Sequence, residues 1–270
     1  MDWSKIKTIF IISFLILDFY LIYEFLNIRN ASQYELLAET SIDKQLKTDG
    51  IEYVELPTED IKDNYLSAIP KSFKSEELKW YGNPKLSNQS IIFANKSYLL
   101  ESVLKKPLKL GKGYEMSRLN NFINNHVIYG EQYRFWEINK EAKTITYYQQ
   151  YKEKSFFKNI YGELTFYLND RNEVISYKQT LLENIKELKE KEKILKPIEA
   201  IETLYEKGLI PPNSNISNVE LGYYTLVHLT SSQVLTPAWR VVINGEQNLF
   251  VNAFEGQLIQ LNNEDKKIVE

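Results

Sequence analysis

Two stretches decide the fold: residues 162–180, GELTFYLNDRNEVISYKQT, and residues 238–261, AWRVVINGEQNLFVNAFEGQLIQL. Each is typical of a strand, a tight polar turn and a returning strand, and Asn244-Gly245 favours a hairpin because both positions tolerate positive φ. Helical patterns at residues 116–125 and 198–207 precede the two blocks. An antiparallel sheet with one face covered by an amphipathic helix explains this order. The sequence therefore predicts an α+β fold of tandem helix-on-antiparallel-sheet modules.

The rest of the chain is divided around these blocks. A charged linker helix is predicted over residues 181–195, where Glu187 and Lys191 are spaced to pair four residues apart. Pro197 can open the next helix and Gly208 can end it. The predicted domains are a short cytoplasmic tail (1–5), a transmembrane helix (6–26), a juxtamembrane helix with the first extracytoplasmic segment (27–113), the first α+β module (114–183), and the linker helix with the second α+β module (184–270).

The N-terminal stretch predicts a membrane span. Residues 6–25 number 20 and would form a helix about 30 Å long, which matches the hydrocarbon core of a bilayer. Fourteen of residues 6–26 are Ile, Leu or Phe. They favour insertion by about 6 kcal/mol as an upper bound, against a cost of about 3 kcal/mol for Asp18. Insertion is therefore favoured.

The residues that flank the span predict its orientation. Lys5 and Lys7 lie at its start and Glu24 closes it, so the positive-inside rule places the N-terminus in the cytoplasm and the C-terminal domain outside. A cleaved signal peptide is the alternative, and it needs small residues one and three positions before the cut. Ala31 could be the first of these, but Arg29 would then occupy the other position. We favour a retained, single-pass anchor in contact with membrane lipid.

Composition and motifs argue against several kinds of function. The net charge of −3 gives no reason to expect nucleic acid, and the 10 glycines form no phosphate-binding loop for a cofactor. His126 and His228 lie far apart in the sequence without further His or Cys nearby, so we expect structural roles rather than a metal site. No Gly-x-Ser-x-Gly, Ser-x-x-Lys or Cys–His pattern supports nucleophilic catalysis, which predicts a non-enzyme. Carboxylate pairs alone leave a glycosidase open.

Asp18 is the sharpest single feature. Carboxylates at membrane depth are costly and usually face protein or water. On a helix Asp18 shares one stripe with four apolar residues, which makes this stripe a candidate partner-binding face. The members of the stripe are Ile11, Phe14, Asp18, Ile22 and Phe25. The functional hypothesis is that Asp18 hydrogen-bonds a polar group on a partner helix; the alternative is a neutral Asp18 tolerated by its apolar surroundings.

Aromatic residues are concentrated between residues 147 and 161. Such a stretch can serve a protein interface, or it can be the alternating core and rim of a strand pair, which we favour. Trp239 and Arg240 are neighbours on a predicted strand and must point to opposite faces. We expect Trp239 in the core and Arg240 at the surface or in a buried pair.

The opening MDWSKIKTIFIISFLILDFYLIYEF, the single N-terminal span and the C-terminal TPAWRVVINGEQNLFVNAFEGQLI resemble the YycI family of membrane-anchored regulators. The resemblance covers essentially the whole chain. It implies a fold similar to YycH, with hairpins shared with PepSY-like and cystatin-like modules. It also implies partners: a YycH-like bitopic protein and a sensor histidine kinase of the YycG (WalK) type, whose two-component system controls cell-wall metabolism in low-GC Gram-positive bacteria.

Three functions follow from these observations. The first is a non-enzymatic regulator of that kinase, acting through the transmembrane helix and the extracytoplasmic domain. The second is an anchored PepSY-like module that binds or inhibits a secreted protease. The third is a cell-wall hydrolase, which requires acid, base or nucleophile groups that converge in a cleft. Asp18 and the missing catalytic motifs favour the regulator.

Overall fold

The computed structural model describes residues 3–73, 86, 88–94, 97–111, 113–227, 229 and 231–260. Its helices are α1 (Trp3–Thr48), α3 (Met116–His126), α4 (Pro197–Glu206) and the 3₁₀ turn η3 (Gly130–Gln132). Its strands are β1 (Glu52–Tyr53), β2 (Lys62–Asp63), β3 (Leu66–Pro70), β4 (Gln89–Ala94), β5 (Leu99–Lys109), β6 (Tyr133–Asn139), β7 (Thr144–Tyr151), β8 (Lys154–Ser155), β9 (Glu163–Leu168), β10 (Glu173–Gln179), β11 (Leu182–Glu187), β12 (Glu192–Lys193), β13 (Asn215–Tyr224), β14 (Gln233–Ile243), β15 (Gln247–Asn252) and β16 (Leu258–Ile259).

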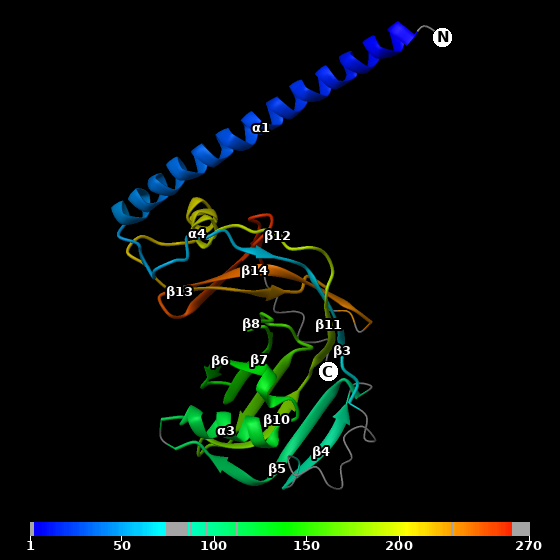
Figure 1. Cartoon of the computed structure of the whole chain (residues 1–270). Helices are drawn as coiled ribbons and strands as arrows, with labels where there is room; N and C mark the ends of the chain where they lie inside the picture. Colours follow the sequence, from blue (N-terminus) through cyan, green and yellow to red (C-terminus); the bar gives the residue numbers. More distant parts are fainter. Residues whose placement is uncertain are drawn as a thin grey trace.

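Helix α1 is a single rod that projects away from the two sheets (Figure 1). Its last turns are packed: Ile42 and Leu46 lie in one buried cluster with Ile201 of α4. The helix ends because Gly50 adopts a positive φ of 69° and the N–H of Ile51 donates to the carbonyl of Leu46 over 2.8 Å. The predicted juxtamembrane helix therefore continues directly from the N-terminal segment.

The large apolar side chains between residues 10 and 23 of α1 are exposed in the isolated chain. Among the residues that the structure describes, no helix is both long enough and apolar enough to be recognised as a membrane span. The predicted span over residues 6–26 stays a prediction.

The middle of the chain forms one module, here called the central module. Its sheet has the strand order β4-β5-β10-β9-β7-β6, and β8 pairs with β7. Alternation along the strands directs Tyr147, Leu164 and Phe166 to one face, where they pack with Leu119 and Phe122 of α3. This is the predicted arrangement of a helix on an antiparallel sheet.

Both ends of the chain build the second module, here called the flanking module. Its sheet runs β1-β13-β14-β15-β16, and β3 joins it by pairing with both β14 and β11. Helix α4 covers one face, with Ile201 and Leu204 packed against Trp239 and Val251. Pro197 stands at the first turn of α4, and the backbone N–H of Lys196 donates to Glu199 Oε2 over 2.6 Å.

The predicted hairpins are confirmed. Asn244 and Gly245 have φ values of 53° and 74°, as a tight turn between β14 and β15 requires. In the β9–β10 turn, Asn169 Oδ1 accepts hydrogen bonds from the backbone N–H groups of Arg171 and Glu173. The register of the β14–β15 hairpin follows from its turn, whereas β10 shifts register against β9 between Val174 and Ser176.

The predicted linker helix over residues 181–195 is wrong. This segment is extended and contains β11 and β12, and β11 pairs antiparallel with β3. Leu182 and Ile194 are buried within the fold. The local helix preference of the charged residues is overridden because β3 pairs with β11 and packs against Leu182, while β2 pairs with β12 and Ile194 packs in the cluster of α4.

The first extracytoplasmic segment contributes to both sheets. Strands β1 and β3 belong to the flanking module, whereas β4 and β5 belong to the central module. The predicted domain boundaries at residues 113/114 and 183/184 stay a prediction. The tandem α+β architecture itself is what the structure shows.

Candidate functional site

The candidate partner-binding stripe lies on α1. The side chains of Ile11, Phe14, Asp18 and Ile22 are exposed, and their spacing places them along one side of the helix. The Phe14 ring lies 5.7 Å from that of Phe10, between centroids. The side chain of Phe25 lies outside the described part of the structure. Because this segment is helical, the described members of the stripe lie on one side of α1. Contact between the stripe and a partner stays a prediction.

The histidines show no convergence with other ligands. His126 ends α3, and its ring centroid is 5.1 Å from that of Phe122. His228 lies outside the described residues. Within the described residues, no group of three or more His, Cys, Asp or Glu side chains could hold a metal ion.

The aromatic residues between 147 and 161 are mostly core: all are buried except Tyr151, which is half-buried. The favoured alternation of core and rim is confirmed only in part, because the consecutive Tyr147 and Tyr148 are both buried. Tyr147 packs below α3, whereas Phe156 and Phe157 are inserted between the two modules. Phe157 approaches Gly222 of β13 so closely that a Cβ added to this glycine would lie 2.4 Å from Phe157 Cζ. The backbone N–H of Phe157 also donates to the carbonyl of Tyr223 over 2.7 Å. These residues fasten the central module to the flanking module.

Trp239 and Arg240 point to opposite faces of β14, as predicted. Trp239 is buried under α4 and its Nε1 donates to the carbonyl of Leu195 over 2.9 Å. Arg240 forms a half-buried ion pair with Glu220, with Nη1 2.6 Å from Oε1. Its guanidinium carbon lies 3.9 Å from the ring centroid of Trp136, which belongs to the central module. Arg240 is therefore a second link between the modules.

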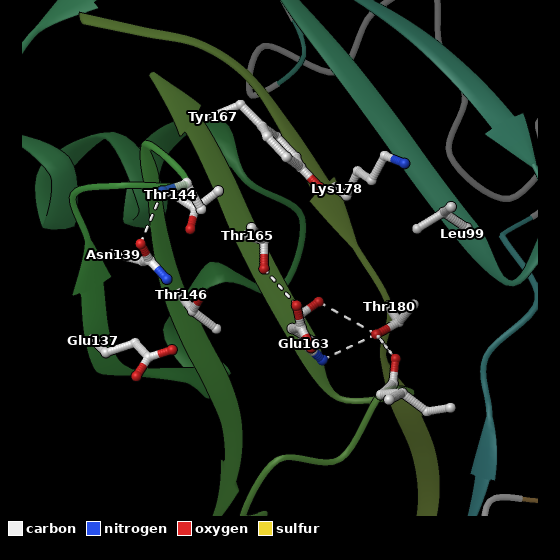
Figure 2. A pocket seen from close by; sticks show the side chains of 12 residues that line it. Leu99, Glu137, Asn139, Thr144, Thr146, Glu163, Thr165, Tyr167, Lys178 and Thr180 are labelled. Atoms are coloured by element: carbon white, nitrogen blue, oxygen red, sulfur yellow. Dashed lines mark hydrogen bonds between the residues drawn. The ribbon is translucent and has the colours of Figure 1, made fainter. Parts of the chain in front are cut away.

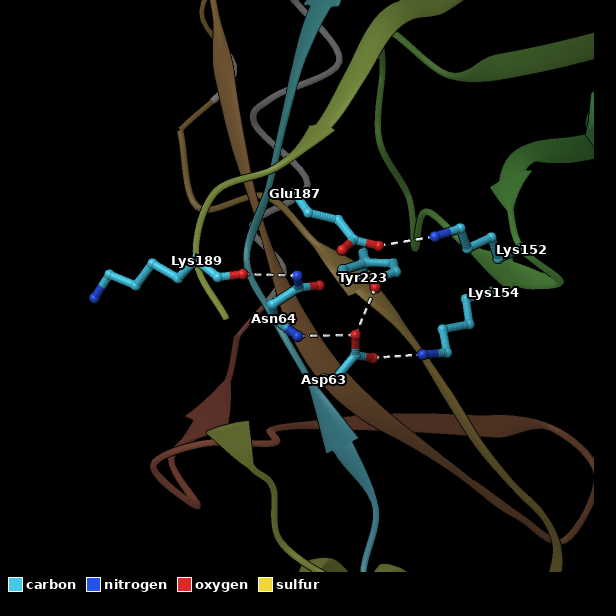
Figure 3. Close-up of polar contacts among 7 residues, drawn as sticks. All are labelled: Asp63, Asn64, Lys152, Lys154, Glu187, Lys189 and Tyr223. Atoms are coloured by element: carbon cyan, nitrogen blue, oxygen red, sulfur yellow. Dashed lines mark hydrogen bonds and ion pairs between the residues drawn. The ribbon is translucent and has the colours of Figure 1, made fainter. Parts of the chain in front are cut away.

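A third link is a buried carboxylate, that of Asp63 (Figure 3). Its Oδ1 accepts hydrogen bonds from the Tyr223 hydroxyl at 2.8 Å and from the backbone N–H of Asn64 at 2.9 Å. Its Oδ2 lies 2.6 Å from Lys154 Nζ. Burial, followed by the Asp63 hydrogen bond, raises the pKa of Tyr223 far above its usual range. Asp63 ends β2, which pairs with β12 beside the flanking module, Tyr223 lies on β13 of that module, and Lys154 lies on β8 of the central module. This site is therefore a polar lock between the two modules.

The other face of the central sheet, opposite α3, carries a polar groove (Figure 2). Its cavity has a volume of about 290 Å³. In the strand register, Thr146 lies between Glu137 and Thr165, and Thr165 lies beside Lys178. The cavity is lined by Leu99, Glu137, Asn139, Ala142, Thr144, Thr146, Ile160, Glu163, Thr165, Tyr167, Lys178 and Thr180.

Hydrogen bonds within the groove hold several of these groups in place. Thr165 Oγ1 donates to Glu163 Oε1 over 2.6 Å, and the backbone N–H of Glu163 donates to Thr180 Oγ1 over 2.9 Å. Burial raises the pKa of Tyr148 well above its usual range, and the negative charges of Glu163 and Glu137 raise it further. Lys178 Nζ lies 3.2 Å from Glu101 Oε1. Around Glu137 and Glu163 the groove is therefore acidic.

The fold and these sites define a class of protein: an α+β chain of two sheet-and-helix modules, locked together and carried on one long N-terminal helix. The chain belongs to the YycI family, because the family model described as "YycI protein" matches residues 31–254. No curated protein matches the sequence.

Three solved structures are similar. An uncharacterized protein from Eubacterium rectale has 10% identity and a TM-score of 0.43, with 78% of this chain and 89% of that chain covered. YycH from Bacillus subtilis has 13% identity and a TM-score of 0.46, with 75% of this chain covered and about half of YycH, 54%. The YpeB C-terminal domain from Bacillus megaterium has 11% identity and a TM-score of 0.43, with 72% of this chain and 100% of that domain covered.

Sequence reasoning missed both the Asp63 lock and the groove. Asp63 has no local signal, because Lys154 and Tyr223 are 91 and 160 residues away in the chain. The groove did have a local sequence signal, because Thr144, Thr146 and Thr165 alternate with core residues on predicted neighbouring strands. Alternation of this kind indicates a shared face, but only the register shows which hydroxyls are neighbours.

Proposed function

We propose that this protein is a non-enzymatic regulator of a sensor histidine kinase of the YycG (WalK) type, which controls cell-wall metabolism. It acts together with a YycH-like bitopic protein, through its N-terminal helix and its folded modules. Membership of the YycI family supports this role. The observation that carries the mechanism is the exposed stripe on α1, where Asp18 stands among apolar side chains.

The proposed location is the cell membrane, with a single pass over residues 6–26, a cytoplasmic N-terminus and an extracytoplasmic C-terminal domain. Lys5 and Lys7 near the start of the span support this orientation. The exposed apolar side chains between residues 10 and 23 would be covered by lipid and by partner helices. In this arrangement α1 connects the membrane directly to the flanking module.

In the proposed mechanism, Asp18 hydrogen-bonds a polar group on a transmembrane helix of a partner. An isolated carboxyl group in hydrocarbon is costly, so a polar partner lowers the free energy of the assembled state. Contact that differs between two states of the kinase shifts their populations. Asp18 is thus the residue that should make the anchor helix select a partner helix that carries a polar group.

The test is a membrane pull-down with the tagged full-length protein. Asp18→Leu removes the carboxylate, and Ser13→Leu is the matched control because Ser13 lies about 140° around the helix from Asp18. We expect wild type and Ser13→Leu to recover a histidine kinase and a second bitopic protein. Asp18→Leu should recover several-fold less of both and change kinase output in cells.

Two outcomes contradict the proposal. Equal recovery and equal kinase output with Asp18→Leu would remove the role assigned to the stripe. If the wild-type protein recovers neither partner, the regulatory function itself is wrong.

A further inference from the structure

The groove on the central sheet contains a recessed hydroxyl that has no hydrogen-bond partner among the described residues. Thr146 is only 7% exposed and lines the cavity. Thr165 and Thr180 are also buried, but their hydroxyls have partners within the protein. Within the described residues, the hydroxyl of Thr146 has none. A hydroxyl is both donor and acceptor, so this group is free to bind a polar ligand.

The charges of the groove limit the chemistry of such a ligand. Glu137 lies beside Thr146 in the register, and Glu163 lies two residues before Thr165 on β9. The one lysine in the lining is paired with Glu101. An anionic ligand would meet two carboxylates without a free cation from the lining. The groove therefore favours a ligand that is neutral or positively charged.

The rest of the lining combines polar and apolar groups. Tyr167 offers an aromatic ring next to Thr144 in the register, while Leu99 and Ile160 supply apolar surface. Ligand sites commonly pair apolar walls with a few well-placed polar groups. Sugar rings match this pattern, because they present hydroxyls around the edge and C–H groups on the faces.

We propose that this groove binds a segment of an oligosaccharide that carries no acidic groups, with Thr146 and Glu163 contacting its hydroxyl or amino groups. Glu163 is held in place by Thr165, so it is ready to accept hydrogen bonds without reorganisation. The inference goes beyond the regulatory role and does not depend on it, because binding can be measured on the isolated full-length protein.

The groove is also connected to the junction of the modules. Glu163 lies against Tyr148, whose ring centroid is 5.3 Å from that of Trp136. Trp136 is covered by Arg240 of the flanking module. A ligand on Glu163 thus lies at the end of a continuous series of contacts that leads to the sheet carried by α1.

The experiment is isothermal titration calorimetry of the full-length protein in lipid nanodiscs. The probes are the tetramers of N-acetylglucosamine and of glucosamine, with the acidic tetramer of galacturonic acid as the anionic control and tetralysine as the peptide control. Thr146→Val keeps the shape of the side chain and removes its hydroxyl, and Glu163→Gln removes the charge. Thr236→Val, on β14 of the flanking module, is the matched control.

We expect saturable binding of one or both of the first two tetramers and none of galacturonic acid. Thr146→Val should weaken binding about three- to tenfold, as the loss of one hydrogen bond predicts. Glu163→Gln should weaken binding of the glucosamine tetramer more than that of the acetylated one, and Thr236→Val should change neither. The proposal is overturned if neither sugar binds, if tetralysine alone binds, or if Thr146→Val and Glu163→Gln bind sugars as wild type does.

Discussion

Asp63 shows how much a single carboxylate can contribute when it is buried. It is 1% exposed and receives an ammonium group, a phenol and a backbone N–H. Each oxygen is satisfied, so the desolvation cost of the charge is offset by strong hydrogen bonds. If the carboxylate is replaced, the Lys154 ammonium group loses its partner at the junction of the modules.

We therefore expect Asp63→Asn to destabilise the protein by about 3 kcal/mol, since one partner of a buried ion pair is removed. The measurement is urea unfolding followed by circular dichroism. Asp170→Asn is the control: this residue pairs with Lys143 on the surface, with a side chain that is 92% exposed, and its unfolding midpoint should match wild type. Equal midpoints for Asp63→Asn and wild type would show that the lock contributes nothing to stability.

Part of the residue-scale picture could be predicted from the sequence. The alternation of Trp239 and Arg240 follows from strand geometry alone, and the structure confirms it. The partners of Arg240 could not be predicted, because Glu220 and Trp136 reach it through pairing and packing between modules. Thr146 could be assigned to a strand but not to a groove, because its neighbours in the groove come from other strands through pairing.

At the scale of elements, the C-terminal end of α1 is fastened by two tyrosines. The Tyr53 hydroxyl donates to Asp43 Oδ1 over 2.5 Å, and the Tyr205 hydroxyl donates to Asp49 Oδ2 over 2.7 Å. Desolvation, then the hydrogen bond to Asp43 and its charge, raise the pKa of Tyr53 to about 12. The folded state therefore keeps the Tyr53 proton in a pH range where the unfolded state loses it.

This difference predicts a pH dependence of stability. Unfolded tyrosine titrates near pH 10, so the contribution of Tyr53 is complete below pH 10 and is lost as pH rises towards 12. Because Tyr53 is only half-buried and is partly screened by water, the contribution is no more than about 1 kcal/mol. Urea midpoints at pH 9 and pH 11 should show the advantage of wild type over Tyr53→Phe shrinking with pH.

A second variant tests the cause. Asp43→Asn keeps an acceptor for the Tyr53 hydroxyl and removes the negative charge, so the convergence with Tyr53→Phe should be smaller in this background. A constant difference between wild type and Tyr53→Phe across the whole range would contradict the assignment.

The elements themselves were predictable where turns and periodicity agree. Asn244-Gly245 and the Asn169–Asn172 turn predict hairpins from local chemistry, and α3 and α4 follow from apolar spacing. The structure of residues 181–195 was not predictable, because the partners of β11 and β12, which are β3 and β2, lie more than 100 residues earlier in the chain. The local sequence of this segment favours a helix, but its pairing with distant strands makes it extended.

At the scale of the whole molecule, Gly222 permits the two modules to meet. An added Cβ would lie 2.4 Å from Phe157 Cζ and 2.5 Å from the carbonyl oxygen of Ser155. Gly222→Ala should therefore destabilise the protein by about 2 kcal/mol through overpacking. Gly113→Ala is the control, since a Cβ there meets nothing within 4 Å.

The same variant tests whether the modules unfold together. Urea unfolding of wild type and Gly113→Ala should follow one cooperative transition by tryptophan fluorescence and circular dichroism. For Gly222→Ala, we expect the two probes to separate because the junction is weakened. Coincident transitions with an unchanged midpoint would mean that the contact with Phe157 tolerates a methyl group.

The unequal attachment of β1 and β3 has a mechanical consequence. Two residue pairs join β1 to β13, whereas β3 is hydrogen-bonded along both of its edges, to β11 and to β14. Tension applied along α1 acts first on the packing of Ile42 and Leu46 and on β1, which is held by two residue pairs. A pull on the helix would therefore detach β1 before β3, whose pairing along both edges keeps the flanking sheet joined to β11.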